Sequence, residues 1–180
     1  MIRRYFLIAA ILMVFTPALS WAKTGAEIDQ EVTQTIQRLR KEQPEAVELI
    51  DAAKGMLVFP KVYGAGFVVG GEYGEGALRV GTTTARYYST SGVSIGFQAG
   101  AEARSIVLLF MTEAELEKFQ KSEGWQVGVD GRVTIIDTGA GKKINTRNVE
   151  APVIGFVFGN QGLMAGISLE GSKFNPIAKS

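Results

Sequence analysis

The chain has 180 residues, and its 19 lysines and arginines against 18 aspartates and glutamates give a formal net charge of +1. That balance argues against nucleic acid as a partner, because phosphate backbones are bound by proteins with a clear basic excess. Histidine and cysteine are both absent, which removes the commonest general base, the commonest transition-metal ligands and any disulfide framework.

Residues 1–22 have the pattern of a secretory signal peptide. Arg3 and Arg4 form a basic start, residues 5–15 are an uninterrupted apolar run, and Ser20-Trp21-Ala22 supplies small residues for cleavage after Ala22. An uncleaved anchor is the alternative, but the apolar run is much shorter than the roughly 20 residues that span a bilayer. We therefore expect a periplasmic or secreted protein, and without cysteine we expect no lipoprotein anchor.

The remaining residues, 23–180, have a usual size for a single domain. Without Arg3 and Arg4, 17 basic residues stand against 18 acidic ones, so the net charge of this domain is about −1. Attraction to an anionic surface would therefore need a local basic patch. We expect a helical segment over 23–54 and a glycine-rich β core over 55–177.

The helical segment begins with a capping box formed by Thr24 and Glu27. An apolar stripe follows at helical spacing over 25–41, and a second short helix is predicted to start at Pro44; the stripe consists of Ile28, Val32, Ile36 and Leu39. This stripe could lie at a lipid interface, or it could pack on the sheet. In the first case Arg38, Arg40 and Lys41 would meet lipid phosphates.

The β core opens with seven glycines over 53–77, set among β-branched and aromatic residues. Such a mixture is typical of strands that bend sharply or let another backbone or a ligand come close. Eight to ten short strands are predicted. The first strands are expected at 56–59, at 66–73 and 77–80 around a turn at 74–76, and at 85–89. The stretch 93–111 is too long for one strand and is expected to bend or turn near 100–104. Two hairpins follow, at 125–137 around Asp130-Gly131 and at 152–169.

A short internal helix is predicted after Thr112, and an exposed loop over 138–149. The fold class that follows is α+β: a curved antiparallel sheet or barrel-like β-sandwich with N-terminal amphipathic helices and one short internal helix.

Five stretches of the chain resemble one known family. They are AKGMLVFPKV, GFVVGGEYGEG, SIGFQAGAEARSIVLLFMTEAELEKF, GWQVGVD and PVIGFVFGNQGLMAGISLEGSK. Together they are similar to the SYLF family of lipid-binding domains, also called the Ysc84-type actin-binding family, in its bacterial envelope branch, over roughly residues 50–175. The resemblance implies phospholipid binding without catalysis or a cofactor, and an association with actin in eukaryotic relatives. Actin is an unlikely partner for an exported bacterial-type chain.

Two groups of charged residues in the glycine-rich region are candidates for ligand contact. Lys54 and Lys61 lie in the block that matches the family's AKG…FPK pattern, so the resemblance places them near a lipid headgroup. Glu72 and Glu75 could line a site that holds a headgroup through an ion, or they could be edge charges that prevent strand pairing with neighbours. Carboxylate catalysis stays formally possible, although no two carboxylates are set apart as acid and base. A structural or protein-interaction module of the envelope is the alternative function.

Overall fold

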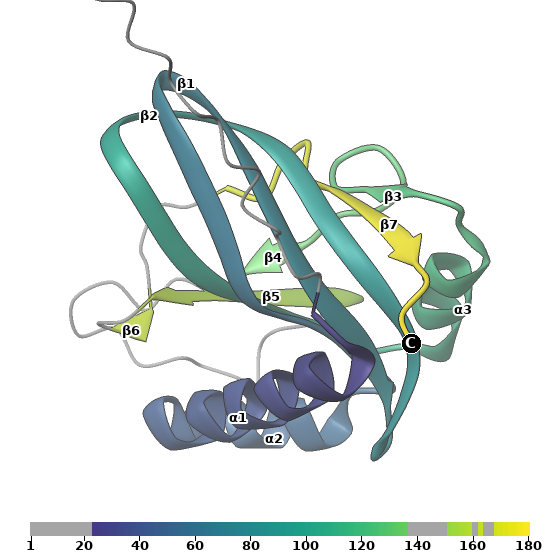
Figure 1. Cartoon of the computed structure of the whole chain (residues 1–180). Coiled ribbons are helices and arrows are strands. Elements are labelled where there is room, and N and C mark those ends of the chain that lie inside the picture. The colour runs from purple at the N-terminus through teal and green to yellow at the C-terminus, as the bar shows by residue number, and fades with distance from the viewer. Residues whose placement is uncertain (1–22, 137–150, 160–161, 164–167) are drawn as a thin grey trace, which may run out of the picture.

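The computed structural model of the chain describes residues 23–136, 151–159, 162–163 and 168–180. In these ranges three α-helices and one seven-stranded curved sheet form the α+β fold that the sequence predicts (Figure 1). The expected signal peptide and the expected loop at 138–149 lie outside the described residues. No helix within the described ranges is both long and apolar enough to cross a membrane.

The helices begin where the sequence predicts. Helix α1 (Gly25–Glu42) starts at Thr24, whose hydroxyl accepts the Glu27 N–H, while the Glu27 carboxylate accepts the Thr24 N–H. A 3-10 turn (Pro44–Ala46) leads into α2 (Val47–Ala52). Helix α3 (Glu113–Lys121) starts at Thr112, whose hydroxyl accepts the Glu115 N–H. These starts were predictable because each depends on hydrogen bonds between residues three positions apart.

Two very long strands replace the predicted series of short ones. Strand β1 (Gly55–Val80) and strand β2 (Thr83–Phe110) pair antiparallel along their whole length. Their connection is Gly81-Thr82, where Gly81 has a φ of 61° that a residue with a side chain rarely adopts. The predicted turn at 74–76 is therefore wrong, because paired strand continues through it. The bend predicted near 100–104 exists, although it lies slightly earlier, where the register of β2 shifts between Gly96 and Gly100.

Both long strands instead double back midway, and β2 follows the wider outer path (Figure 1). Between the pairs Gly66–Gly100 and Val68–Gly96, β1 advances two residues while β2 advances four, which supplies the extra length of the outer arc. The two limbs of β1 then touch. A Cβ on Gly76 would lie 2.0 Å from the Val58 carbonyl oxygen. The glycines allow this close backbone approach, as their abundance suggested.

Five further strands complete the sheet. Strands β5 (Val153–Gly159) and β7 (Lys173–Ile177) pair with opposite ends of β2. Three two-residue strands extend the sheet. They are β3 (Trp125–Gln126), which pairs with β7, and β4 (Thr134–Ile135) and β6 (Gly162–Leu163), which both pair with β5, β4 in the parallel direction. The predicted turn near Asp130 exists, because the Asp130 carboxylate accepts the Gln126 N–H at 2.7 Å. The predicted pairing of its two flanks is wrong, since β3 and β4 join different neighbours.

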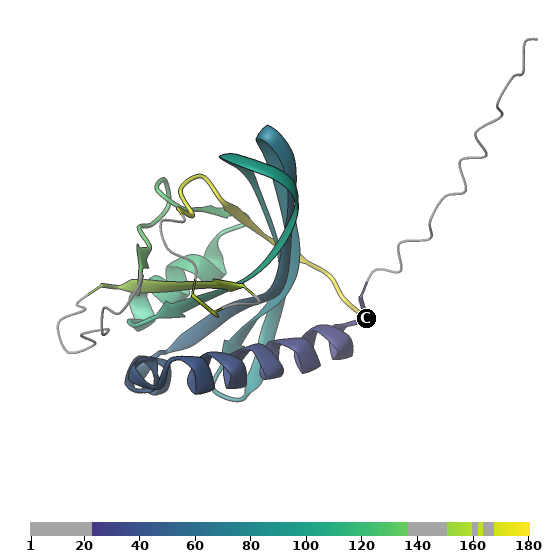
Figure 2. The same ribbon diagram turned by 90° about the vertical axis from the view of Figure 1, so that its left-hand side faces the viewer.

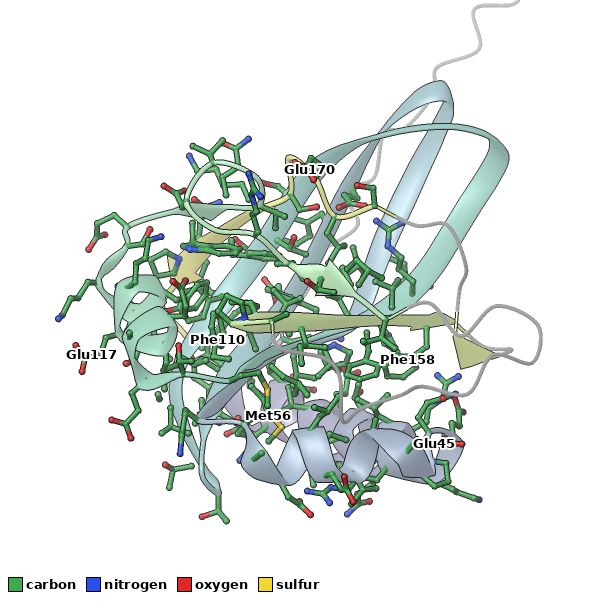
Figure 3. All side chains as sticks on the ribbon, turned by 180° about the vertical axis from the view of Figure 1, so that it is seen from behind. Glu45, Met56, Phe110, Glu117, Phe158 and Glu170 are labelled. Atoms are coloured by element: carbon green, nitrogen blue, oxygen red, sulfur yellow. The ribbon has the colours of Figure 1, made fainter. Side chains whose placement is uncertain are left out.

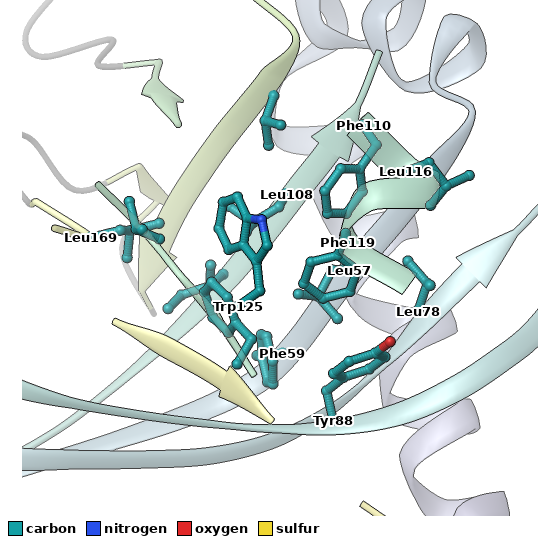
Figure 4. Packing of buried hydrophobic residues seen from close by; sticks show 14 of the residues in the cluster. Leu57, Phe59, Leu78, Tyr88, Leu108, Phe110, Leu116, Phe119, Trp125 and Leu169 are labelled. Carbon is teal, nitrogen blue, oxygen red and sulfur yellow. The ribbon is translucent and has the colours of Figure 1, made fainter. Parts of the chain in front are cut away.

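Where the helices pack on it, the sheet is buried on both faces, which explains its apolar runs there. On the concave face, residues of β1, β2 and β5 pack against α3 and an aromatic group that includes Tyr88, Phe119 and Trp125 (Figure 4). On the convex face, alternate residues of the same strands pack against α1 and α2 (Figures 1 and 2). Met56 and Phe158 belong to this second layer (Figure 3). Two cores thus share one curved sheet.

Candidate functional site

The two limbs of β1 bring together the charged and aromatic residues that the sequence singled out. A Cβ on Gly74 would lie 2.9 Å from Cγ2 of Val62, so the chain between these residues is a doubled-back segment. Because side chains alternate along a strand, one set points into the concave face and the other set points outward. The two sets have different chemistry and are described separately.

On the concave side, Glu72 forms a buried ion pair with Arg104. The Glu72 carboxylate accepts a short hydrogen bond from the Arg104 guanidinium and a second from the Ser172 hydroxyl at 3.2 Å. The Glu72 side chain is only 3% exposed and that of Arg104 only 10%. Glu72 belongs to one limb of the bent hairpin and Arg104 to the other, so the pair ties the limbs together and to the turn before β7.

This geometry corrects the interpretation of Glu72 as an exposed edge charge. Gly92 lies directly opposite Glu72, and a Cβ there would be 2.8 Å from the carboxylate. The pairing glycine therefore leaves the space that the buried carboxylate occupies. The described residues include no group of three or more acidic side chains placed to hold a metal ion.

Glu75 points to the opposite face from Glu72 and has different partners. Its carboxylate accepts a hydrogen bond from the Lys179 ammonium at 2.8 Å and one from the Tyr73 hydroxyl at 3.0 Å. Burial, followed by the Glu75 hydrogen bond, raises the pKa of Tyr73 above its ordinary value. The structure therefore does not bring Glu72 and Glu75 into one site, and they cannot act on a ligand as a carboxylate pair.

Lys61 takes part in a cluster that joins β1 to α1. Its ammonium lies 3.2 Å from one oxygen of the Glu31 carboxylate, and the Lys23 ammonium lies 2.5 Å from the other. Burial acts to raise the pKa of Glu31, but the hydrogen bonds from Lys23 and Lys61 outweigh it and the net shift is downward. Two cations thus converge on one anion. Tyr63, two residues beyond Lys61 on the same strand, is 56% exposed.

The other basic candidates are dispersed. Arg38 pairs with Glu42 and stacks over the Phe158 ring, and Arg40 pairs with Asp51 at 2.5 Å. Lys41 and Lys54 are exposed, and within the described part of the chain neither makes a side-chain ion pair. The five predicted basic residues therefore do not form one patch.

The apolar stripe of α1 is sealed against the sheet. Ile28, Val32 and Leu39 are each no more than 1% exposed and pack in the convex-face core. Burying three such side chains stabilises the fold by about 5 kcal/mol or more, which a helix moved to a lipid interface would have to recover. Of the two readings left open by the sequence, packing on the sheet is therefore the one observed.

Sequence reasoning missed Lys23, Glu31 and Arg104. Lys23 precedes the N-cap of α1 and Lys61 is thirty residues from Glu31, so the three residues do not share one element whose period could relate them. Arg104 is separated from Glu72 by thirty-two residues. Only the register of the hairpin could have indicated the second pair, and that register depends on irregularities invisible in the sequence.

Comparison with known proteins shows which family the chain is similar to. Residues 91–178 match a family model described as "Ysc84: Las17-binding protein actin regulator". Over these residues the chain is similar to the Ysc84 family, also called SYLF. It is similar to the rat and mouse proteins named "SH3 domain-containing YSC84-like protein 1", with 28% identity over 158 residues, and to the human protein of that name, with 27%.

These alignments cover 85% of the chain but 46% of each relative. The chain thus spans about half the length of the curated relatives it matches. The Ysc84 family is linked to actin and lipid binding and is a family of binding domains. In this chain, the residues available for such contacts are those exposed on its own surface.

Proposed function

We propose that this chain is a non-catalytic phospholipid-binding protein of the bacterial cell envelope. It would reach the periplasm or the outside of the cell after removal of residues 1–22. Basic side chains would contact anionic headgroups, and apolar side chains would contact the interfacial region of the bilayer. Lys41, Lys54 and Lys61 are the predicted headgroup contacts whose side chains are exposed. Arg38 and Arg40 each pair with a carboxylate of their own, so they contribute less, whereas Lys61 shares the Glu31 carboxylate with Lys23.

The observation that carries the proposal is similarity to a family linked to lipid binding. The chemistry of the described residues favours binding over turnover. Glu72 is held by Arg104 and Glu75 by Lys179, on opposite faces of one strand. General acid–base catalysis by two carboxylates requires both to reach one substrate, and these two cannot.

Co-sedimentation of the purified protein with liposomes tests the proposal. Vesicles of phosphatidylcholine alone and vesicles containing phosphatidylglycerol should be compared at low and at physiological salt. We expect binding that is stronger to the anionic vesicles and weaker at higher salt. If neither type of vesicle brings down protein, the proposed function is wrong.

Export requires its own measurement. Mass spectrometry of the protein recovered from an envelope fraction should give a chain that begins at Lys23. A chain that keeps residues 1–22 would contradict cleavage after Ala22, and recovery only from the cytosol would contradict export.

A protein-interaction module of the envelope is the second candidate function. The description of the matching family as a Las17-binding protein favours it, because that description names a protein partner. Saturable capture of one envelope protein in the absence of lipid binding would select this function over the first. Binding to purified actin filaments, assayed in the same way, would show that the family's actin link extends to this chain.

A further inference from the structure

The convex face of the sheet is covered by α1 at one end only. Val58 and Ala77, on the two limbs of β1, lie under α1 in the convex-face core. Farther along the same limbs, Tyr63 and Tyr73 point to the same face but are 56% and 52% exposed. Among the described residues, only Val129 is a more exposed large apolar side chain. The tyrosines therefore lie on the same face as the convex-face core, but on the part of it that α1 does not cover.

The two rings lie close together in the fold. Tyr63 and Tyr73 are the immediate neighbours of Val62 and Gly74, which touch where the limbs of β1 meet. Figure 1 shows these limbs side by side above α1. Two half-exposed aromatic side chains on one rigid, paired strand are positioned without help from a mobile loop.

Two ammonium groups lie beside Tyr63. Those of Lys23 and Lys61 share the single carboxylate of Glu31, whereas Glu75 is paired with the nearly buried Lys179. The domain as a whole carries a net charge of about −1, so attraction to an anionic surface depends on a local pair of cations such as this one. A tyrosine ring has an apolar body and a polar tip, which suits it to the level of lipid headgroups.

We propose that the outer surface of the β1 limbs, formed by Tyr63 and Tyr73 with Lys23 and Lys61, is the face that docks on an anionic phospholipid bilayer. This inference rests on the proposed phospholipid binding and names the surface that performs it. The rings enter the interfacial layer, while the two ammonium groups that now share Glu31 meet lipid phosphates. Helix α1 keeps its apolar stripe in the core and supports the surface from below.

Substitution of the tyrosines provides the test. Tyr63→Ser combined with Tyr73→Ser should weaken partitioning onto phosphatidylglycerol-containing vesicles about tenfold, because two half-exposed rings no longer leave water. Lys23→Gln combined with Lys61→Gln should reduce the preference for anionic over neutral vesicles by a similar factor. Val129→Ser removes a more exposed apolar side chain from a different part of the fold and should change neither quantity.

A fluorescence measurement keeps the test independent of folding defects. Tyr63→Trp should show an emission maximum that shifts to shorter wavelength when anionic vesicles are added, whereas Val129→Trp should not shift. The chain's own Trp125 is buried and supplies a constant background. Thermal unfolding of each variant confirms that it is folded.

Three results would decide between the ideas. If the wild-type protein binds vesicles but the double serine variant binds equally well, this surface is wrong and the proposed function stands. A blue shift for Val129→Trp alone would place the contact around Val129 and would also refute the surface. If the wild-type protein binds no vesicle at all, both proposals fall.

Discussion

The ion pair between Glu72 and Arg104 should be worth more to the folded state than its position in a glycine-rich strand suggests. The two side chains are 3% and 10% exposed, so water does little to screen either charge. Glu72→Gln keeps the shape and the Ser172 hydrogen bond but leaves the Arg104 cation buried without a counter-charge. Removing one partner of a buried pair typically costs about 3–5 kcal/mol. We expect the free energy of unfolding to fall by that amount.

The double variant separates the pair from its surroundings. Arg104→Met leaves the Glu72 carboxylate with only the Ser172 hydroxyl, so this single variant should also be strongly destabilised. In Glu72→Gln/Arg104→Met no uncompensated charge remains, so the loss should be several kcal/mol smaller than the sum of the two singles. Urea unfolding followed by tryptophan fluorescence measures all three. Single variants within 1 kcal/mol of wild type, or strictly additive losses, would refute the reasoning.

Three other predictions follow from contacts at the same hairpin and at α1. Gly76→Ala should destabilise the protein by about 2–3 kcal/mol in urea unfolding, because its Cβ would lie 2.0 Å from a backbone oxygen, whereas Gly71→Ala has nothing within 4 Å and should be near neutral. Thr24→Ala should cost about 1 kcal/mol and shorten the helical signal in circular dichroism. Burial and then the Asp29 hydrogen bond raise the pKa of Tyr87 above 10.0, so stability should hold below pH 10.0 and fall as pH rises through the folded-state pKa, less steeply in Tyr87→Phe.

The parts of the fold that depend on short-range signals were predictable. The helix starts at Thr24, Pro44 and Thr112 each rest on chemistry within four residues. The curved sheet was predictable because β-branched and aromatic residues alternate with glycine over many positions. The turn at Asp130 also follows from its own residues. In each case a local hydrogen bond or a local pattern decides the structure.

The length of strands β1 and β2 could not be predicted from such local signals. Glycines at 74 and 76 indicate a turn by local rules, yet they serve contact between the two limbs of β1, which are more than ten residues apart in sequence. The true turn at Gly81-Thr82 lacks the residue pair most typical of two-residue hairpins. Strand β7 was not predicted because it contains Pro176, and proline is unfavourable inside a sheet. Here Pro176 lies beyond the residues of β7 that pair with β3, so its missing N–H costs little.

The candidate site was predictable only in part, for a related reason. Lys61, Glu72 and Glu75 were identified by their position in the glycine-rich stretch, but their partners come from distant segments. Because the apolar stripe of α1 is buried in the convex-face core, the helix cannot present it to a membrane, and a membrane contact would have to use the exposed surface beyond the helix. A sequence cannot distinguish an apolar stripe that faces a sheet from one that faces a membrane, because both bury the same residues.

Four of the described glycines of β1 fall into two groups with different physical reasons. At Gly74 and Gly76, an added Cβ would collide with the opposite limb, so packing requires glycine there. Gly64 and Gly71 have no atom within 4 Å of a built Cβ and no left-handed backbone angle, so packing does not. Both are next to or two residues from an exposed tyrosine. Small neighbours leave an aromatic ring free to approach a flat surface, which is the approach that a bilayer interface requires.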